Sequence, residues 1–240
     1  MRSFKKYPFI FLLFSFIAAT GQGFAKSKSA KSSKPSKSPN YEKEVLCNSP
    51  RIIVFRNFLT PEECDHLISY SKPYLKRSTV IDDKSSGSLK DDRRTSEGMF
   101  MPYNHGDLKI QKIEERISKV TSIPVSHGES IQVLHYQVGG EYQPHYDFFD
   151  PSTAGGLHHY NRGGQRVCSF LMYLNTPDEG GATVFPNVNI AVQPRKGDAL
   201  LFYNINEMGQ TDRLSLHGGA PVVRGEKWLA TKWLREKEFD

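Results

Sequence analysis

The second half of this 240-residue sequence is a succession of short apolar segments separated by turns that contain glycine. Eight segments rich in β-branched and aromatic residues follow Ser130, and segments of this length and composition are typical of strands. They cover residues 131–138, 142–148, 166–174, 183–185, 190–193, 199–203, 219–223 and 227–233. The turns between them contain Gly139-Gly140, Gly163-Gly164, Gly180-Gly181, Gly197 and Gly225. Many short strands joined by such turns predict a jelly-roll core, or double-stranded β-helix.

Two helices are expected before these strands. A first strand over residues 51–55 leads into a helix that has Thr60 as its N-cap, Pro61 as its first residue and Glu63 completing a capping box. A second helix begins near Asp107, because aliphatic residues follow at intervals of three and four. These aliphatic residues are Ile110, Ile113, Ile117 and Val120. The sequence therefore predicts a mainly β fold whose core is a double-stranded β-helix flanked by helices.

The N-terminal region has the pattern of a targeting segment. Basic residues at positions 2, 5 and 6 precede an apolar run over residues 7–19, and Gly23 and Ala25 offer small side chains for cleavage. We expect residues 1–25 to be a cleaved signal peptide, with an uncleaved membrane anchor as the alternative. Residues 26–44 are rich in Lys, Ser and Pro and are expected to be a disordered linker. A folded domain over residues 45–240 would then lie in the lumen of the endoplasmic reticulum or the Golgi.

The basic charge of the chain belongs to its N-terminal region. The formal net charge is +6, but residues 1–44 hold nine of the 32 basic and two of the 26 acidic side chains. The remaining residues carry 23 basic and 24 acidic side chains. Proteins that bind nucleic acid need a basic face on the folded domain. We therefore expect no nucleic-acid partner, and membrane contact only through an uncleaved leader.

Three cysteines, Cys47, Cys64 and Cys168, would enter an oxidising compartment if the leader directs secretion. Cys47 and Cys64 flank the first expected strand and are candidates for a disulfide, but spacing alone does not establish the required geometry. An odd number leaves at least one thiol outside any intramolecular bridge.

The chemistry is indicated by His145-Tyr146-Asp147. Alternate side chains of a strand share a face, so His145 and Asp147 could bind one metal ion. His217, just before a late strand, is the best third ligand. Two histidines and one carboxylate on one face of a metal ion are typical of non-haem Fe(II) sites that bind a bidentate co-substrate and O₂.

Lys227 strengthens this interpretation. It lies ten positions after His217, on an expected core strand that contains Trp228, Leu229 and Trp233. A lysine in such a strand is rarely buried without a partner. The far carboxylate of a dicarboxylate co-substrate would be that partner.

The order of several motifs makes the chain resemble a known family. These motifs are RTSEGMF (94–100), YQVGGEYQPHYD (136–147), LMYLN (171–175), GGATVFP (180–186), KGDAL (196–200) and SLHGGAPVVRGEKW (215–228). Together they resemble the catalytic domain of prolyl 4-hydroxylases, especially the short monomeric type of plants and algae. The resemblance covers residues 52–233 and leaves the leader and the linker outside.

The resemblance implies His145, Asp147 and His217 as iron ligands and Lys227 as the residue that binds the distal carboxylate of 2-oxoglutarate. Tyr136 and Thr183 are further candidates beside that carboxylate. The implied reaction hydroxylates C4 of a peptidyl proline while O₂ and 2-oxoglutarate yield succinate and CO₂. L-ascorbate would keep the iron reduced, and the enzyme would act as a monomer.

The implied substrate is a proline-rich polypeptide in the polyproline II conformation, which aromatic grooves recognise. Residues 82–96 would form a loop that closes over it. The candidate contacts are Tyr142 and Trp233 as the walls of a groove, and Arg94, Glu129 and Arg162 as partners of the peptide backbone. The adjacent His158 and His159 are expected in a surface loop and not at a second metal site.

Two other functions remain open at this stage. One is a 2-oxoglutarate dioxygenase that acts on peptidyl lysine or on nucleic acid. The other is a binding module that keeps the fold without catalysis, although such modules usually lose a metal ligand or the lysine. Side-by-side assays on proline-rich, lysine-containing and alkylated DNA substrates would separate them.

Overall fold

The computed structural model describes residues 39–82, 85, 87–102 and 106–239. The expected leader and most of the expected linker lie outside these ranges. Within them, no helix has the length and apolar character needed to cross a membrane.

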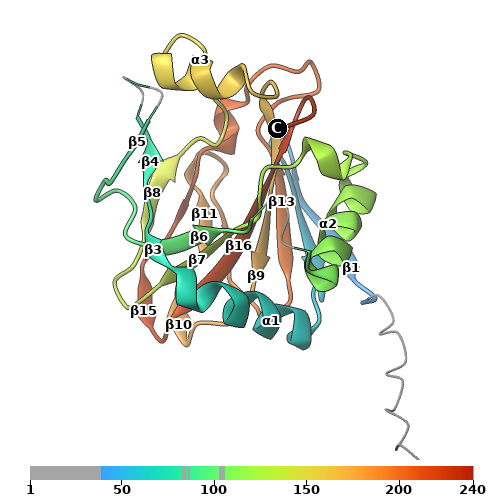
Figure 1. The fold of residues 1–240 in the computed structure, drawn as a ribbon, viewed down its shortest axis with the longest axis vertical. Coiled ribbons are helices and arrows are strands. Elements are labelled where there is room, and N and C mark those ends of the chain that lie inside the picture. Colours follow the sequence, from blue (N-terminus) through green and yellow to red (C-terminus); the bar gives the residue numbers. More distant parts are fainter. Residues whose placement is uncertain (1–38, 83–84, 86, 103–105, 240) are drawn as a thin grey trace, which may run out of the picture. The chain divides into compact units, whose positions relative to one another are not determined.

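An eight-stranded antiparallel sheet is the largest element of the domain (Figure 1). Its strands lie in the order β1–β2–β13–β9–β16–β7–β6–β3. Their bounds are β1 Glu42–Asn48, β2 Arg51–Arg56, β13 Ala199–Tyr203, β9 Arg166–Tyr173, β16 Lys227–Arg235, β7 Gln132–Tyr136, β6 Glu97–Phe100 and β3 Lys76–Arg77. We call this the major sheet.

A four-stranded antiparallel sheet, the minor sheet, has the order β12–β11–β14–β8. Its strands are β12 Ile190–Val192, β11 Thr183–Phe185, β14 His217–Gly219 and β8 Tyr142–His145. Two small two-stranded sheets complete the strands: β10 Glu179–Gly180 with β15 Val222–Arg224, and β4 Val80–Ile81 with β5 Ser88–Leu89.

The major sheet buries apolar side chains on both faces. On one face, Ile53, Phe55 and Phe170 pack with residues of helices α1 (Pro61–Ser71) and α2 (Leu108–Thr121). On the other face, the neighbouring positions Ile52 and Val54 pack in a second cluster. That cluster also takes in Phe185 and Val192 of the minor sheet, so it fills the space between the two sheets. In Figure 1, α1 runs below the strands of the major sheet and α2 lies to their right.

The caps of both helices follow the sequence. Thr60 caps α1 with the expected reciprocal bonds to Glu63, and Asp107 caps α2 by accepting from the backbone N–H of Lys109 and Ile110. Ile110, Ile113 and Ile117 are buried on one face of α2. The predicted fold class, a double-stranded β-helix with flanking helices, is confirmed.

Several strands differ from their predicted bounds by a few residues at their ends, and two of them differ in a way that affects the site. The strand predicted over residues 142–148 ends at His145, so Asp147 lies in a bend beyond β8. The strand predicted over residues 219–223 is two strands that belong to different sheets. They separate at Ala220-Pro221, because proline has no N–H for a ladder hydrogen bond and Ala220 donates to the carbonyl of Ala182.

A short helix was not predicted. Residues 154–160 form α3 (Ala154–Tyr160), which Thr153 caps by accepting from the N–H of Gly156. His158 and His159, expected in a loop, therefore lie on a helix. His158 is exposed, and the ring of His159 stacks on Phe149 with centroids 5.5 Å apart.

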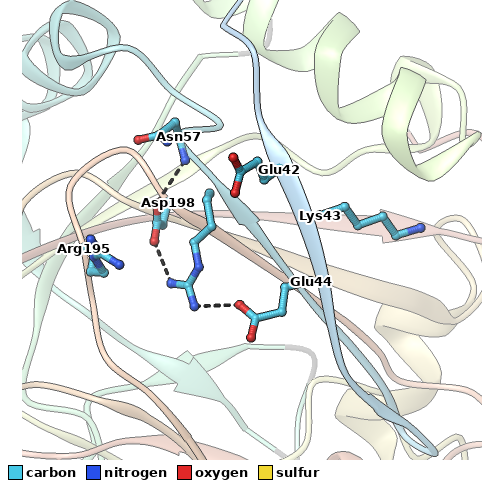
Figure 2. Close-up of a pocket in the computed structure, with 7 residues that line it drawn as sticks. Glu42, Lys43, Glu44, Asn57, Arg195 and Asp198 are labelled. Carbon is cyan, nitrogen blue, oxygen red and sulfur yellow. Dashed lines mark hydrogen bonds and ion pairs between the residues drawn. The ribbon is translucent and has the colours of Figure 1, made fainter.

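Residues 42–44, expected in the linker, are the first residues of β1. The strand pairs with β2 over its whole length, and the ring of Tyr41 just before it lies 5.6 Å from the rings of Phe55 and Phe58. Arg56 of β2 donates to Glu44 and to Asp198, each at 2.8 Å. These ion pairs lie in a hollow beside β1 (Figure 2) lined by Glu42, Lys43, Glu44, Arg56, Asn57, Arg195 and Asp198. Packing and charge pairs thus order a segment whose composition predicts disorder.

All three cysteines are free thiols. Cys64 packs in the cluster beneath the helices, whereas Cys47 packs against the cluster on the other face of the major sheet. The disulfide considered between them is absent because the sheet separates their side chains.

Candidate active site

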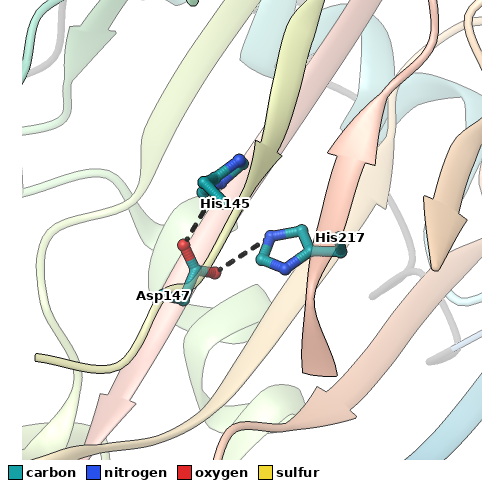
Figure 3. A group of neighbouring side chains, drawn as sticks. All are labelled: His145, Asp147 and His217. Carbon is teal, nitrogen blue, oxygen red and sulfur yellow. Dashed lines mark ion pairs between the residues drawn. The ribbon is translucent and has the colours of Figure 1, made fainter. Parts of the chain in front are cut away.

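Three side chains from two distant parts of the chain meet between the two sheets (Figure 3). His145 ends β8 and His217 begins β14, and the two residues are direct partners in the register of these strands. Asp147 lies between the two imidazoles: its Oδ1 is 3.6 Å from Nε2 of His145, and its Oδ2 is 3.5 Å from Nε2 of His217. All three candidate ligand atoms lie within 4.8 Å of one another. The structure therefore brings together the three residues that the sequence nominated.

Backbone carbonyls orient both imidazoles. Nδ1 of His145 is 2.9 Å from the carbonyl oxygen of Gln143, and Nδ1 of His217 is 3.0 Å from that of Ser215. A carbonyl only accepts, so each Nδ1 carries the proton. Each Nε2 then presents its lone pair toward Asp147, which is the arrangement of a metal-binding histidine with an oriented ring.

Buried polar groups hold the carboxylate of Asp147. Ser169 donates to Oδ2 at 2.6 Å, and Asn204 donates to Ser169 at 3.0 Å. A guanidinium nitrogen of Arg166 lies 3.5 Å from the backbone oxygen of Asp147. These contacts fix a residue that no strand positions.

The electrostatics favour the metal-binding protonation states. Burial alone would raise the pKa of Asp147, but the neighbouring His217, His145 and Arg166 hold it well below its usual value. Burial lowers the pKa of His217 to about 4. At neutral pH the group is therefore an ionised carboxylate beside a neutral His217.

This donor set fits a divalent cation. The buried carboxylate and the two Nε2 lone pairs surround a point at which a positive charge would be stabilised. Asp147 and His217 are only 7% and 5% exposed. Two imidazoles and one carboxylate suit Fe(II) with open positions for a co-substrate. Within the described part of the chain, this is the one cluster of such residues with metal-ligand spacing.

A pocket extends from the metal group to Lys227. Its lining is Arg94, Leu134, Tyr136, Tyr142, His145, Asp147, Leu171, Thr183, His217, Gly218, Gly219, Lys227, Leu229, Thr231 and Trp233. Lys227 is 2% exposed, and no carboxylate of the described residues lies within ion-pair distance of it. Its ammonium nitrogen lies 5.5 Å from the centre of the Tyr136 ring. The lysine thus offers an unmatched positive charge inside the pocket that holds the metal group.

Thr183 lines the same pocket, and one partner of this residue was not predicted. The hydroxyl of Tyr173 donates to Oγ1 of Thr183 at 2.9 Å, and both residues are buried. Tyr173 shares a strand face with Leu171, a pocket residue two positions earlier, so the alternation within LMYLN contained this signal. What the sequence lacked was a way to tell which face of β9 meets the pocket.

Three of the five substrate candidates line the pocket, namely Arg94, Tyr142 and Trp233. The Arg94 guanidinium lies 4.8 Å from the centre of the Tyr142 ring, and that ring stacks on His145 with centroids 3.6 Å apart. Arg94 also donates to Gln132 at 2.9 Å.

The other two candidates lie elsewhere. Glu129 is buried and accepts two hydrogen bonds of 2.6 Å from Arg166, outside the pocket lining. Arg162 is exposed, with its guanidinium over the ring of Phe239. The arginine that stacks on Trp233, 4.1 Å from its ring centre, is Arg166, four residues later. Sequence reasoning missed Arg166 because a glycine turn precedes it and either arginine could have faced the site.

Comparisons with known proteins agree with this geometry. Residues 131–235 match the model of the 2OG-Fe(II) oxygenase superfamily, a range that contains the metal group and Lys227. Prolyl 4-hydroxylase 5 of Arabidopsis thaliana is 46% identical over 217 residues, which cover 82% of this chain and 72% of that protein. The chain belongs to the prolyl 4-hydroxylase family. The resemblance inferred from the motifs is confirmed.

Solved structures extend this result. The viral collagen prolyl hydroxylase of Paramecium bursaria Chlorella virus-1, in its 2OG complex, is 29% identical, with a TM-score of 0.58 over 79% of this chain and 98% of that one. A prolyl hydroxylase of Trichoplax adhaerens, in complex with a hypoxia inducible factor peptide fragment, shares the fold at 19% identity and a TM-score of 0.57, over 79% of this chain and 85% of that one. This prolyl 4-hydroxylase family member is therefore a dioxygenase that uses Fe(II), 2-oxoglutarate and O₂.

The protonation of Lys227 should make co-substrate binding depend on pH. Burial lowers the pKa of Lys227 to about 8, so the free pocket holds an ammonium below that pH and loses it above. A bound carboxylate would stabilise the ammonium and raise this pKa, so binding above pH 8 requires proton uptake. We expect the Kd of 2-oxoglutarate for the Mn(II)-loaded protein to rise about tenfold per pH unit above pH 8. Calorimetric titrations at pH 7, 8 and 9 in two buffers with different ionisation enthalpies would measure the Kd and the proton uptake, and a Kd that stays flat up to pH 9 would contradict this assignment.

Proposed function

We propose that this enzyme hydroxylates C4 of prolines in extended, proline-rich polypeptides within the secretory pathway. The observation that carries the proposal is the single pocket in which the metal group faces a buried, unpaired lysine and ends at aromatic side chains. Fe(II) with O₂ and 2-oxoglutarate supplies the oxidising chemistry, in which 2-oxoglutarate becomes succinate and CO₂. The protein binds, orients and shields the reactants.

Each part of the pocket has one task in this scheme. His145, Asp147 and His217 would hold the iron, and Lys227 would bind the distal carboxylate with help from the Thr183 hydroxyl. The apolar walls that keep water from the reacting centre are Leu134, Leu171 and Leu229.

The rim of the pocket suits a polyproline II chain. Trp233 lines the pocket, and its ring centre lies 6.5 Å from that of Phe100, which is 55% exposed. Phe100 and Thr231 are both register partners of Gln132, so the three side chains share the pocket face of the major sheet. The indole N–H of Trp233 is buried without an acceptor among the described residues. The two aromatic rings can pack against proline rings, and the indole N–H can donate to an exposed backbone carbonyl of a polyproline II chain.

The location and the working state are proposals as well. The leader over residues 1–25 supports entry into the endoplasmic reticulum or Golgi lumen, where proline-rich secreted proteins pass. L-ascorbate is expected to return iron to Fe(II) after turnovers that are not coupled to peptide. A monomer is supported by the edge strand β1, because its charged residues Glu42, Lys43 and Glu44 disfavour pairing with another sheet.

Mass spectrometry of peptides incubated with enzyme, Fe(II), 2-oxoglutarate and ascorbate would test the proposal. Peptides of the (Ser-Pro)n and (Pro-Pro-Gly)n types should gain 4-hydroxyproline, and reactions without 2-oxoglutarate should not. Hydroxylation of Ser-Pro repeats alone would identify cell-wall-type glycoproteins as the substrate class. Hydroxylysine formation or demethylation of alkylated DNA, with both proline peptides unchanged, would refute the proposal that the enzyme hydroxylates proline.

Phe100 offers a direct test of the substrate groove. Replacing Phe100 with alanine removes an exposed ring, so the fold should be preserved while contact with a proline of the substrate is lost. An aromatic contact contributes about 1 kcal/mol, or roughly fivefold in affinity. We expect KM for a ten-residue (Ser-Pro)n peptide to rise about fivefold, with kcat and KM for 2-oxoglutarate unchanged. Val138→Ala, at another exposed apolar residue, is the control; a peptide KM equal to that of the wild type would place the groove elsewhere.

A further inference from the structure

Gly219 interrupts a row of side chains that faces the pocket. In the minor sheet, Gly219 is the register partner of Thr183 on one side and of Tyr142 on the other. All three residues line the pocket. Directly paired residues of antiparallel strands project to the same face. Between the Thr183 hydroxyl and the Tyr142 ring there is thus a position without a side chain.

The backbone does not require glycine at this position. The φ angle of Gly219 lies outside the left-handed region, whereas Gly181 in the same pocket region has φ +71°. A Cβ atom on Gly219 would have as its nearest neighbours two Tyr142 atoms, at 3.7 and 3.9 Å, and Nζ of Lys227 at 3.8 Å. These are ordinary contact distances. By contrast, a Cβ on Gly218 would come within 2.9 Å of the Tyr142 carbonyl oxygen.

The space beside Gly219 lies on the path between the two ends of the co-substrate. Along β14, Gly219 comes two residues after the metal ligand His217, or about 6.6 Å at the rise of a strand. Its missing side chain points toward the ammonium of Lys227, which has no carboxylate partner among the described residues. A linear 2-oxo diacid held by the metal group and by Lys227 must therefore place its distal half against Gly219.

We propose that Gly219 determines specificity for the co-substrate, because it keeps free the space for the distal half of a five-carbon 2-oxo diacid. This inference rests on the proposed roles of the metal group and Lys227. A methyl group at position 219 is compatible with the protein alone, but it occupies room that the carboxylate needs next to the lysine. In a close-fitting pocket one methylene group changes affinity by about 10- to 200-fold.

The test is a calorimetric titration of Mn(II)-loaded protein with two ligands. 2-Oxoglutarate fills the whole path, whereas 2-oxobutyrate keeps the chelating keto acid and lacks the distal carboxylate. For Gly219→Ala we expect at least a tenfold higher Kd for 2-oxoglutarate, with the Kd values of Mn(II) and 2-oxobutyrate within twofold of wild type. Gly219→Val should weaken 2-oxoglutarate further. Lys112→Ala, at an exposed residue of α2 outside the pocket lining, is the control and should leave all three Kd values unchanged.

Thermal unfolding without ligand separates this effect from a damaged fold. Gly219→Ala should unfold at or above the wild-type temperature, since a compatible Gly→Ala change restricts the unfolded chain. An unchanged 2-oxoglutarate Kd would overturn the proposal, and so would equal weakening of both ligands, which would place the effect at the metal. If wild-type protein binds Mn(II) but not 2-oxoglutarate, the co-substrate assignment itself fails along with the role of Gly219.

Discussion

Replacing His217 with alanine is expected to abolish 2-oxoglutarate decarboxylation and to remove bound iron. His217 supplies one of three ligand atoms, and the remaining two, from His145 and Asp147, leave a weak bidentate site. The loss also leaves the buried Asp147 carboxylate without the imidazole 3.5 Å from its Oδ2. We expect turnover to fall by at least about 1,000-fold, the scale on which loss of a group that assembles the reacting centre acts.

Two measurements and one control make this result specific. Iron content after anaerobic loading reports on metal binding, and release of CO₂ from 2-oxoglutarate reports on activity. His158→Ala, which removes an exposed imidazole on α3, should behave as wild type in both. Near-wild-type iron content in His217→Ala would remove His217 from the ligand set.

The packing of His217 calls for a second variant. Its ring lies 4.3 Å from that of Phe202 and 5.9 Å from that of Phe185, so alanine leaves a cavity that lowers stability. His217→Gln keeps most of the volume and lacks the imidazole nitrogen. Equal loss of iron in both variants, with cooperative thermal unfolding retained in the glutamine variant, would assign the effect to ligation.

The sequence located the metal group because its chemistry is encoded in residue types. Only certain side chains bind Fe(II), and two of the three lie within one short motif. The prediction that strand alternation places His145 and Asp147 on one face was nevertheless wrong for Asp147. Strand alternation does not place Asp147, because β8 ends at His145. Ser169 on β9 holds the carboxylate instead, and Arg166 on the same strand contacts the backbone oxygen of Asp147. Contacts between distant strands have no local signal in the sequence.

The same limit explains what was missed in the fold. Strands β3, β4, β5 and β10 have two residues each, and β6 has four, which is too short for an alternating pattern to be recognised. The longer strands β2, β9 and β16 and the capped helices α1 and α2 were predicted because each carries several periods of its own pattern. The seven-residue strand β1 and the short helix α3 were not predicted. Tyr173 was missed because the sequence does not tell which face of β9 meets the pocket, and only the pairing of the sheets decides that. Arg166 was missed because it follows a glycine turn, and the register of β9 with β16 shifts between Cys168 and Arg166.

Replacing Lys227 with alanine is expected to raise KM for 2-oxoglutarate by at least about 30-fold while iron content stays at the wild-type level. The Lys227 ammonium is buried in the pocket without a carboxylate partner among the described residues, so its removal leaves the distal carboxylate of the co-substrate buried and unpaired. Removing one member of a buried charge pair costs about 2–5 kcal/mol, or roughly 30-fold and more.

The ligand itself provides the control for this prediction. Lys227→Ala should bind 2-oxobutyrate, which has no distal carboxylate, about as well as wild type does. The losses of binding free energy from the mutation and from the missing carboxylate should therefore not be additive. Lys227→Met, which keeps an apolar stem, should give the same KM increase with better stability, because it removes a buried charge. Lys112→Ala, at an exposed lysine on α2, should leave the affinity for both ligands unchanged. If wild-type and Lys227→Met protein bind 2-oxoglutarate equally, another group binds the distal carboxylate and Lys227 does not.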